Sequence, residues 1–351
     1  MSWGIVGTGT IASKFAVASA RAGQPVAAVS SRSASTGQDF AARFEIPAAV
    51  SSIEELVALP QVRRIYVATP NERHRDDVLA GIAAGVPVLC EKPLAISAAE
   101  GRELVDAAQA AGVFLMEGLW TLCLPVYRDV LARLADGAIG EVREVEANFA
   151  VPHGPDTMPR LFDGPGAGAL LDRGVYAIAL ARAVLGPELQ LVHASGDLSS
   201  SGVDLAASLI LESPTGARAV LSVAVDRMGS NRMAIAGTRG RITLEEPLAN
   251  PAGFRVATID PNATPSPPLG APGLTDRITE QLMRRSTLRS VAKAALRRPS
   301  GAAGGLDDQI AHVEACLAAG RTESDWVPLS SSIAVLELID DARAALAAQR
   351  A

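Results

Sequence analysis

The sequence predicts an α/β fold, in which an N-terminal doubly wound domain with a parallel sheet precedes a C-terminal α+β domain with a large, mostly antiparallel open sheet. Three observations support this prediction. Apolar, strand-like runs alternate with helix-like segments up to about residue 120. A glycine-rich turn, Gly7-x-Gly9-x-x-Ala12, follows the first run. Beyond residue 190, short segments alternate apolar with polar side chains. We therefore expect domains of residues 1–120 and 121–351.

Composition narrows the class of protein. The 351 residues carry a net charge of −6, so the chain has no overall basic field to attract nucleic acid. Three widely spaced cysteines without a CxxC motif favour free thiols in a reducing cytoplasm. No apolar stretch is long enough to span a bilayer, and the N-terminus lacks the basic start of a signal peptide. We expect a cytoplasmic protein that binds neither nucleic acid nor membrane and holds no metal.

The first strand, residues 2–6, runs directly into the glycine-rich turn, and a helix follows through about Ala22. Gly7 permits the tight turn, Gly9 lets the backbone approach a pyrophosphate, and Ala12 allows close helix packing. The turn is thus predicted to bind a dinucleotide through Gly7, Thr8, Gly9, Thr10 and Ile11. The alternative is an ordinary strand-to-helix turn.

The second strand, residues 26–29, indicates which dinucleotide binds. NAD-binding domains place a carboxylate about 20 residues beyond the glycines to hold the ribose hydroxyls. Here the strand is followed by Ser30-Ser31-Arg32. A hydroxyl and a guanidinium favour a 2′-phosphate, so Ser31 and Arg32 predict NADP, with NAD the less favoured cofactor. The alternative is that Arg32 is a solvated loop residue.

Polar residues follow the next two strands, residues 65–68 and 86–89. A cation at a strand end acts on whatever occupies the crevice of a doubly wound sheet, which makes Lys92 the central residue. His74, in a first helical turn, has the alternative of satisfying local hydrogen bonds. Ser97 and Glu100 form a capping box for a helix through Ala111, and a strand at 113–116 completes the alternation. Predicted cofactor contacts at these strand ends are Ala68, Thr69, Asn71, His74, Glu91 and Lys92.

The second half reads as α+β. Alternating strands between residues 190 and 244, joined by turns such as Ser213-Pro214-Thr215-Gly216, indicate an antiparallel sheet whose second face is a candidate dimer surface. The other expected elements are helix 125–135, strand 141–149, a loop at 152–168, helix 172–185, a loop at 261–273, and helices 306–319 and 330–348, of which the first and last helices are candidates to pack on the N-terminal domain.

Residues 274–298 form a basic segment. Seven arginines and lysines against two acids give 7 − 2 = +5, on a pattern that suggests an amphipathic helix. It could be a lid over an anionic cofactor, a partner-binding helix or, third, a membrane-surface helix. A solvated excursion without a role is the alternative.

Four motifs together resemble one family: the glycine-rich turn, Ala68-Thr69-Pro70-Asn71-x-x-His74, Glu91-Lys92-Pro93 and Asp172-x-Gly174-x-Tyr176. They are similar to the Gfo/Idh/MocA family of glucose-fructose oxidoreductases, inositol dehydrogenases and MocA proteins. The segments 116–120 and 172–176 are most similar to its dimeric dihydrodiol dehydrogenase and NADP-xylose dehydrogenase branch. The resemblance implies a Rossmann domain for residues 1–120 and a substrate-binding, dimerising domain for the rest.

The resemblance also implies that Lys92 and Tyr176 face a nicotinamide, with Asp172 beside them, in an enzyme that moves a hydride to or from a hydroxyl or carbonyl of a sugar, dihydrodiol or polyol. A phenol titrates near 10, so we expect Lys92 to lower the pKa of Tyr176, which then acts as general acid and base. Four residues before Tyr176, Asp172 shares its helix face and orients Lys92 or substrate. The alternative has Asp172 capping the helix and Tyr176 packing in the core.

Substrate contacts are predicted for Trp120 and Arg160, along with Asp172 and Tyr176. Two residues depart from the branch: Arg173 stands where an apolar residue is usual, and Leu122 where arginine is usual. The rival function is a non-catalytic dinucleotide sensor, but the lysine and tyrosine that catalysis needs are both present.

Overall fold

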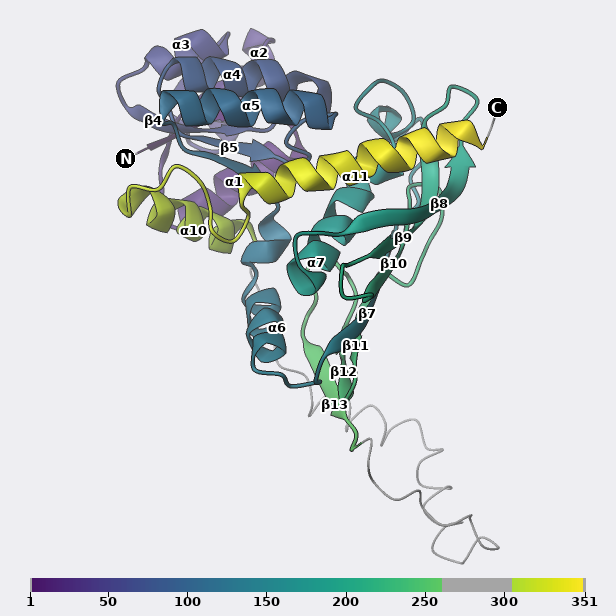
Figure 1. Cartoon of the computed structure of the whole chain (residues 1–351). Helices are drawn as coiled ribbons and strands as arrows, with labels where there is room; N and C mark the ends of the chain where they lie inside the picture. The colour runs from purple at the N-terminus through teal and green to yellow at the C-terminus, as the bar shows by residue number, and fades with distance from the viewer. Residues whose placement is uncertain (1, 261–304, 350–351) are drawn as a thin grey trace, which may run out of the picture.

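The computed structural model describes residues 2–260 and 305–349. Its N-terminal part is a six-stranded parallel sheet with the strand order β3-β2-β1-β4-β5-β6 and helices on both faces (Figure 1). The elements are β1 (Ser2–Val6), α1 (Thr10–Arg21), β2 (Val26–Ser30), α2 (Ala34–Arg43), β3 (Ala48–Val50), α3 (Ile53–Ala58), β4 (Val62–Val67), η1 (Asn71–Arg73), α4 (His74–Ala83), β5 (Val88–Glu91), α5 (Ala98–Ala111) and β6 (Leu115–Gly118).

The predicted alternation of strands and helices is confirmed, with one stretch that the sequence analysis left unassigned. Residues 34–58 form α2, β3 and α3. Helix α2 begins because the Ser33 hydroxyl accepts a hydrogen bond from the Thr36 amide, and it buries Phe40. Helix α5 begins at the predicted Ser97 cap, whose hydroxyl accepts from the Glu100 amide. Strand β5 extends to Glu91, two residues beyond its predicted end.

The C-terminal part is a seven-stranded sheet of order β13-β12-β11-β7-β10-β9-β8. Only β7 and β10 pair in parallel; the other pairs are antiparallel, as predicted for a mostly antiparallel sheet. The elements are η2 (Trp120–Cys123), α6 (Pro125–Ala135), β7 (Val142–Ala150), η3 (Pro159–Leu161), η4 (Leu170–Gly174), α7 (Val175–Leu185), β8 (Gln190–Leu198), β9 (Asp204–Glu212), β10 (Arg218–Ala224), β11 (Met233–Gly237), β12 (Gly240–Leu244), β13 (Phe254–Thr258), α10 (Leu306–Ala318) and α11 (Leu329–Ala348).

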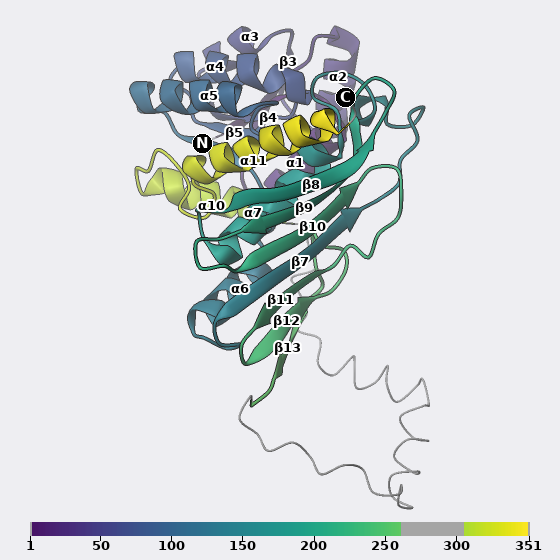
Figure 2. The same cartoon turned by 45° about the vertical axis from the view of Figure 1, so that its right-hand side comes forward.

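One face of this sheet packs on α7, and the other faces outward (Figure 2). The register of β9 and β10 pairs Leu209 with Leu221, both buried on the covered face. On the outward face Ser208 pairs with Ser222, and Val220 is 44% exposed. Period-2 alternation therefore separates a core face from an uncovered face.

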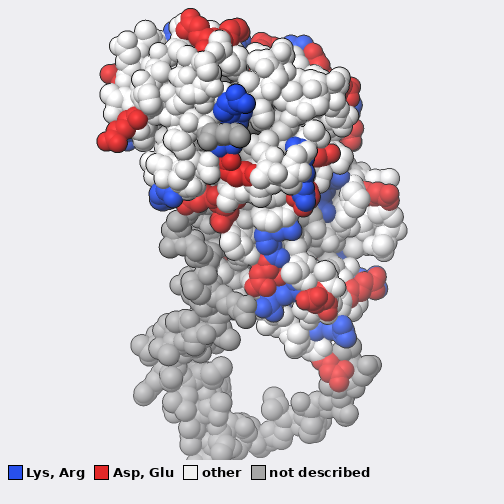
Figure 3. Space-filling model, turned by 90° about the vertical axis from the view of Figure 1, so that its left-hand side faces the viewer, with Lys and Arg blue, Asp and Glu red and all other residues white. Residues whose placement is uncertain are grey.

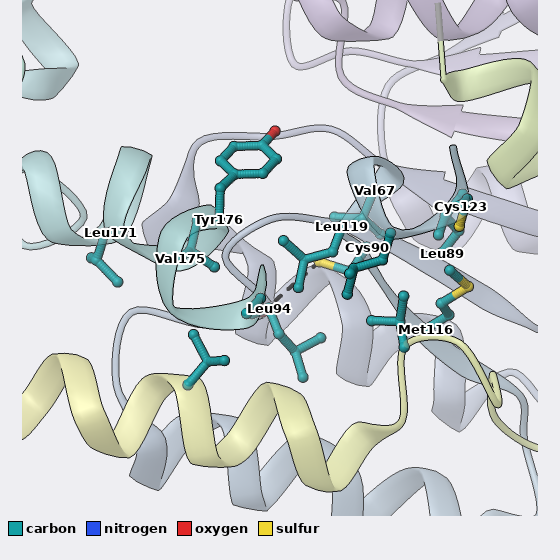
Figure 4. Close-up of a cluster of buried hydrophobic side chains, with 14 of the residues drawn as sticks. Val67, Leu89, Cys90, Leu94, Met116, Leu119, Cys123, Leu171, Val175 and Tyr176 are labelled. Carbon is teal, nitrogen blue, oxygen red and sulfur yellow. Dashed lines mark hydrogen bonds between the residues drawn. The ribbon is translucent and has the colours of Figure 1, made fainter. Parts of the chain in front are cut away.

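The two parts share a core and their helices interlock. Helix α10 packs on α1, where Arg21 and Asp307 pair, and α11 runs from α5 across to β8 (Figure 1). The Asp340 carboxylate on α11 accepts a hydrogen bond from the Ala98 amide at the start of α5. Apolar side chains from β4, β5 and β6 meet those of η4 and α7 in one continuous cluster (Figure 4). This shared core fixes the position of α7 relative to the carboxyl ends of β4, β5 and β6.

Surface charge is mixed where it can be seen. On the face shown in Figure 3, basic side chains are interspersed with acidic ones over the described residues. No helix of the described residues has the length and apolar character to cross a membrane. The basic segment 274–298, with the preceding loop 261–273, lies outside the described residues.

Candidate functional site

The site lies where the carboxyl ends of the parallel strands meet α7. Strand β1 pairs with β2 on one side and β4 on the other, so the chain order reverses at β1. Ligands of doubly wound sheets bind in the crevice at this reversal. The loops after β1, β2, β4 and β5 carry the predicted cofactor residues to that one edge.

The glycine-rich turn has the geometry of an anion cradle. Gly7 has φ +105°, and a Cβ there would lie 2.8 Å from the Ala68 carbonyl oxygen. A Cβ on Gly9 would meet nothing within 4 Å, which leaves open space over the backbone. Helix α1 has no side-chain N-cap and no acidic residue in its first turn, so its amides remain for an anion. Thr8 and Ile11 are half-buried around the turn and Thr10 is exposed. These residues fit a dinucleotide pyrophosphate.

The end of β2 carries no carboxylate. Ser31 is buried, and its amide donates to the Val50 carbonyl. Arg32 is exposed and makes no ion pair with another described residue. Ser33 is occupied in capping α2. The Arg32 guanidinium thus lies after the second strand, the region in which doubly wound domains hold the ribose of a dinucleotide.

The loop after β4 is held from two directions. The Thr69 hydroxyl donates to Asp77 at 2.7 Å. The Asn71 amide donates to the Gly166 carbonyl at 2.9 Å, which joins this loop to the segment before η4. Both residues lie at the crevice, half-buried, with Ala68 buried beneath them.

His74 does not fit the predicted cofactor contact. It is fully buried, with Nδ1 2.7 Å from the Pro93 carbonyl and Nε2 3.0 Å from the Thr69 carbonyl. Burial lowers the pKa of His74, although these two carbonyls favour the protonated ring. The imidazole therefore connects the loops after β4 and β5 through both of its nitrogens, which corresponds to the alternative of local hydrogen bonding.

Lys92, Asp172 and Tyr176 come together across the two parts. The Lys92 ammonium donates to Oδ1 and to the backbone carbonyl of Asp172, both at 3.0 Å. It also lies 5.1 Å from the centre of the Tyr176 ring. Two of its three donors are thus used, and one remains for a ligand. Asp172 lies in the π-helical turn η4, where the helix is wider than an α-helix, just before Tyr176.

Asp172 is a buried carboxylate among cations. Burial favours its neutral form, but Lys92 and then Arg173 and Arg160 lower its pKa to about 2. It is therefore ionised at neutral pH and holds Lys92 by charge as well as by hydrogen bonds.

The expectation that Lys92 lowers the pKa of Tyr176 is wrong for this state. Burial, followed by the charges of Glu91 and Asp172, raises that pKa well above its ordinary value. Lys92 lies over the ring face and gives its hydrogen bonds to Asp172. The Tyr176 hydroxyl accepts a hydrogen bond from Trp120 Nε1 at 3.0 Å and points away from the neighbouring apolar cluster (Figure 4). The phenol is held neutral, with its own proton available to donate.

Glu91 lies behind Lys92 and differs from Asp172 in its surroundings. It is 5% exposed and accepts a hydrogen bond from the Tyr66 hydroxyl. Burial raises its pKa to about 7, against the effects of Tyr66 and Lys92. The side chain is therefore a buried group that titrates near neutral pH, rather than an exposed cofactor contact.

The predicted substrate residues surround the mouth of this cluster. Trp120 packs edge-on to Tyr176, and Arg160 Nη1 lies 3.7 Å from Asp172 Oδ1. Of the two departures, Leu122 is buried in the core, but Arg173 reaches the site, with Nε 3.3 Å from Asp172 Oδ2.

Sequence reasoning missed two neighbours of Arg173. Its Nη2 lies 2.9 Å from His153 Nε2, and its guanidinium lies 4.7 Å from the centre of the Phe149 ring. Phe149 is buried, in line with the alternation of buried residues along β7, so the sequence pattern could have indicated its inward position. Nothing local connects His153 with a residue twenty positions later.

One group of metal-ligating types occurs among the described residues, away from this site. Ligand atoms of His312, Cys316 and Asp325 lie within 4.8 Å of one another. His312 Nε2 is 2.7 Å from the Ser324 hydroxyl, and Asp325 pairs with Arg321 at 2.7 Å. His312 and Asp325 thus already have partners within the protein, and the positive charge of Arg321 would repel a metal cation.

Comparison with known proteins agrees with the fold. Residues 1–119 match the model of an oxidoreductase family with an NAD-binding Rossmann fold, GFO/IDH/MocA, and residues 127–243 match the C-terminal domain of that family. A trans-1,2-dihydrobenzene-1,2-diol dehydrogenase of Bos taurus is 31% identical over 353 residues, covering 99% of this chain and 97% of the relative.

Solved structures of low identity share the fold. The 3-ketoreductase KijD10 of Actinomadura kijaniata, in complex with NADP and TDP-benzene, has a TM-score of 0.77 at 23% identity, covering 99% of this chain and 98% of that one. A levoglucosan dehydrogenase with NADH and levoglucosan has a TM-score of 0.79 at 19% identity, with the same coverage. Both family models and the full-length relative agree, and the chain belongs to the GFO/IDH/MocA family of oxidoreductases.

Proposed function

We propose that the protein is an NADP-dependent dehydrogenase or reductase that acts on a CH–OH or carbonyl group of a sugar, diol or related polyol. The observation that carries this proposal is the Lys92–Asp172 ion pair set over the ring of Tyr176, at the carboxyl edge of the dinucleotide-binding sheet. Its family relatives include a dihydrodiol dehydrogenase, which supports the same chemistry. A non-catalytic sensor would have no need of this buried, charged constellation.

The three side chains have separate tasks in the proposed reaction. NADP, when bound, supplies or accepts the hydride. Tyr176 is neutral, and its oxygen already accepts from Trp120, so it is suited to donate its proton to the carbonyl oxygen of substrate in the reducing direction. The same group takes the proton back in oxidation. Lys92 directs its remaining N–H at that oxygen and stabilises the charge that forms there.

Asp172 is proposed as a positioning residue. Both of its contacts with Lys92 are at 3.0 Å, one through the carboxylate and one through the backbone, which fixes the ammonium in one direction. A lysine has four flexible side-chain bonds, so this fixation matters for a donor that must meet a reacting oxygen.

The preference for NADP over NAD is proposed from the end of β2. Arg32 is an exposed cation and Ser31 a neighbouring hydroxyl, where an acidic residue would repel a 2′-phosphate. We also propose a cytoplasmic location, since all three cysteines are free thiols.

The proposal is tested by two substitutions. Lys92→Ala and Tyr176→Phe should each lower kcat by about 10²–10⁴-fold, the usual range for a lost proton-transfer or charge-stabilising group. The dissociation constant for the reduced cofactor NADPH, measured by its nicotinamide fluorescence, should change only a few-fold. Tyr127→Phe is the matched control, because its buried hydroxyl donates to the Leu248 carbonyl in the core. Near-normal turnover by either site variant would refute the assignment.

We propose in addition a homodimer through the outward face of the C-terminal sheet. This face is not covered by α7 (Figure 2). It carries the exposed Val220 and a hollow of about 370 Å³, which is lined by residues of β7 to β10 and of the loop after β10. Sedimentation of the wild type and of Val220→Glu tests it: the variant should shift towards monomer, and a wild type that sediments as monomer would exclude the dimer.

A further inference from the structure

The substrate end of the site has an excess of positive charge. Three cations face the Asp172 carboxylate: Lys92 at 3.0 Å, Arg173 at 3.3 Å and Arg160 at 3.7 Å. Three positive charges against one negative charge leave 3 − 1 = +2 over these four residues. His153, which contacts Arg173, is mainly neutral at pH 7, because burial and then Arg173 lower its pKa.

Arg173 lies largely shielded from solvent, in a position to bind a ligand. Its side chain is only 15% exposed, with the guanidinium over Phe149 and one terminal nitrogen against His153. Its Nε is buried and lacks a hydrogen bond of good geometry to Asp172. Leaving a guanidinium desolvated without full compensation is unfavourable, so a ligand anion that completes its contacts would be bound strongly.

Arg160 completes a two-sided arrangement. It projects from the exposed η3 turn, 54% exposed, towards the same carboxylate. Arg173 lies near Oδ2 of Asp172 while Lys92 and Arg160 lie near Oδ1, so the three cations surround this carboxylate. An anionic group bound between the arginines therefore lies within a few carbon atoms of the oxygen that Lys92 and Tyr176 act on.

We propose that the substrate is anionic: a hydroxy or oxo compound with a carboxylate or phosphate group, bound by Arg173 and Arg160. This inference rests on the proposed function for the identity of the reacting centre. It narrows the substrate class from neutral sugars and diols to acidic ones, such as a sugar acid or a sugar phosphate.

Matched ligands test the charge directly. Binding of glucose, glucuronate and glucose 6-phosphate to the enzyme–NADP complex is measured by calorimetry, and turnover of each is followed by nicotinamide absorbance. We expect at least one acidic member to bind about 10–100-fold more tightly than glucose, which at about 1.4 kcal/mol per tenfold is about 1.4–2.8 kcal/mol. The carboxylate and phosphate arms identify which anion the pocket prefers.

Two variants locate the effect. Arg173→Met keeps much of the side-chain length that packs over Phe149 and removes the charge. Arg160→Met also removes a charge, but from an exposed side chain, so it should not destabilise the core. Each should weaken the preferred acidic ligand by about tenfold or more and glucose by less than about threefold. Arg143→Met, which removes an exposed partner of Glu141, is the control and should change neither.

The outcomes separate the two proposals. Glucose binding as tightly as both acidic members, or equal effects of the arginine variants on acidic and neutral ligands, overturns the anionic substrate. Tighter acidic binding supports it even where none of the three is turned over. The proposed function is decided separately, by the kcat of the Lys92 and Tyr176 variants on a substrate that the wild type converts.

Discussion

Replacing Glu91 by glutamine should remove a pH-dependent loss of stability that the wild type shows as the pH rises from about 5 to about 7. The glutamine oxygen can still accept the hydrogen bond from Tyr66, so the change removes mainly the ionisable group. Burial raises the pKa of Glu91 from an ordinary 4.5 to about 7. Because the folded-state pKa lies above the unfolded value, the stabilisation is fully present below pH 4.5 and is lost as the pH rises through 7.

The magnitude follows from that difference in pKa. At about 1.4 kcal/mol for each tenfold change, raising the pKa from 4.5 to about 7 corresponds to about 3 kcal/mol in total. Between pH 5 and pH 8, linkage gives a decrease of about 2.5 kcal/mol in the wild type that the glutamine variant lacks. Asp172 does not contribute in this range: its pKa is lowered to about 2, so its stabilisation is lost only in acid.

The assay is urea unfolding of both proteins from pH 5 to pH 8, taking the difference in unfolding free energy at each pH. Histidines with lowered pKa are present in both proteins, so their effect cancels in the difference. Glu103→Gln is the control: Arg75 lowers the pKa of this exposed group, so the variant should show no change between pH 5 and pH 8. A wild type and a Glu91→Gln variant with parallel curves would refute the assignment of a neutral-range pKa to Glu91.

The remaining predictions concern the cofactor. Arg32→Ala should raise the dissociation constant for NADP by about 10–100-fold and leave that for NAD nearly unchanged, with the exposed Arg63→Ala as control; equal effects on both would remove the coenzyme argument. Gly7→Ala should destabilise the fold by about 1–3 kcal/mol or more, because the new Cβ would press on the Ala68 carbonyl at a φ of +105°. Gly9→Ala has free space and should melt like the wild type yet bind NADP more weakly; a melting temperature lowered as much as in Gly7→Ala would contradict this.

The fold was predictable where side-chain period and turn residues coincide. Local signals predicted the strands β1, β4 and β5 from their buried runs and the start of α5 from the Ser97 cap, and the structure confirms them. Residues 34–58 gave no prediction because their elements are short and α2 is largely polar, held by Ser33 and by Phe40 against the sheet. The parallel pairing of β7 with β10 joins strands that are far apart in the sequence, so no local pattern predicts it.

The site was predictable as a set of residues but not as a set of contacts. Sequence position and family resemblance together named Lys92, Asp172 and Tyr176, which the structure brings together from different parts of the chain. Lys92 points towards Asp172, which lies in the π-helical turn before α7, and no local sequence pattern predicts that contact. The role of His74 depends on where two loop carbonyls lie.

Two carboxyl groups near Lys92 have widely different pKa values because of their neighbours. Asp172 faces three cations and stays ionised, while Glu91 is buried against a neutral phenol and titrates near 7. Enzymes use such divergent pKa values to divide acid and base roles between like groups. Here the ionised carboxylate fixes Lys92, and an ionised Glu91 raises the pKa of Tyr176 further. Protonation of Glu91 therefore makes Tyr176 a stronger acid, so the reducing direction, in which Tyr176 gives up its proton, should be favoured as the pH falls below 7.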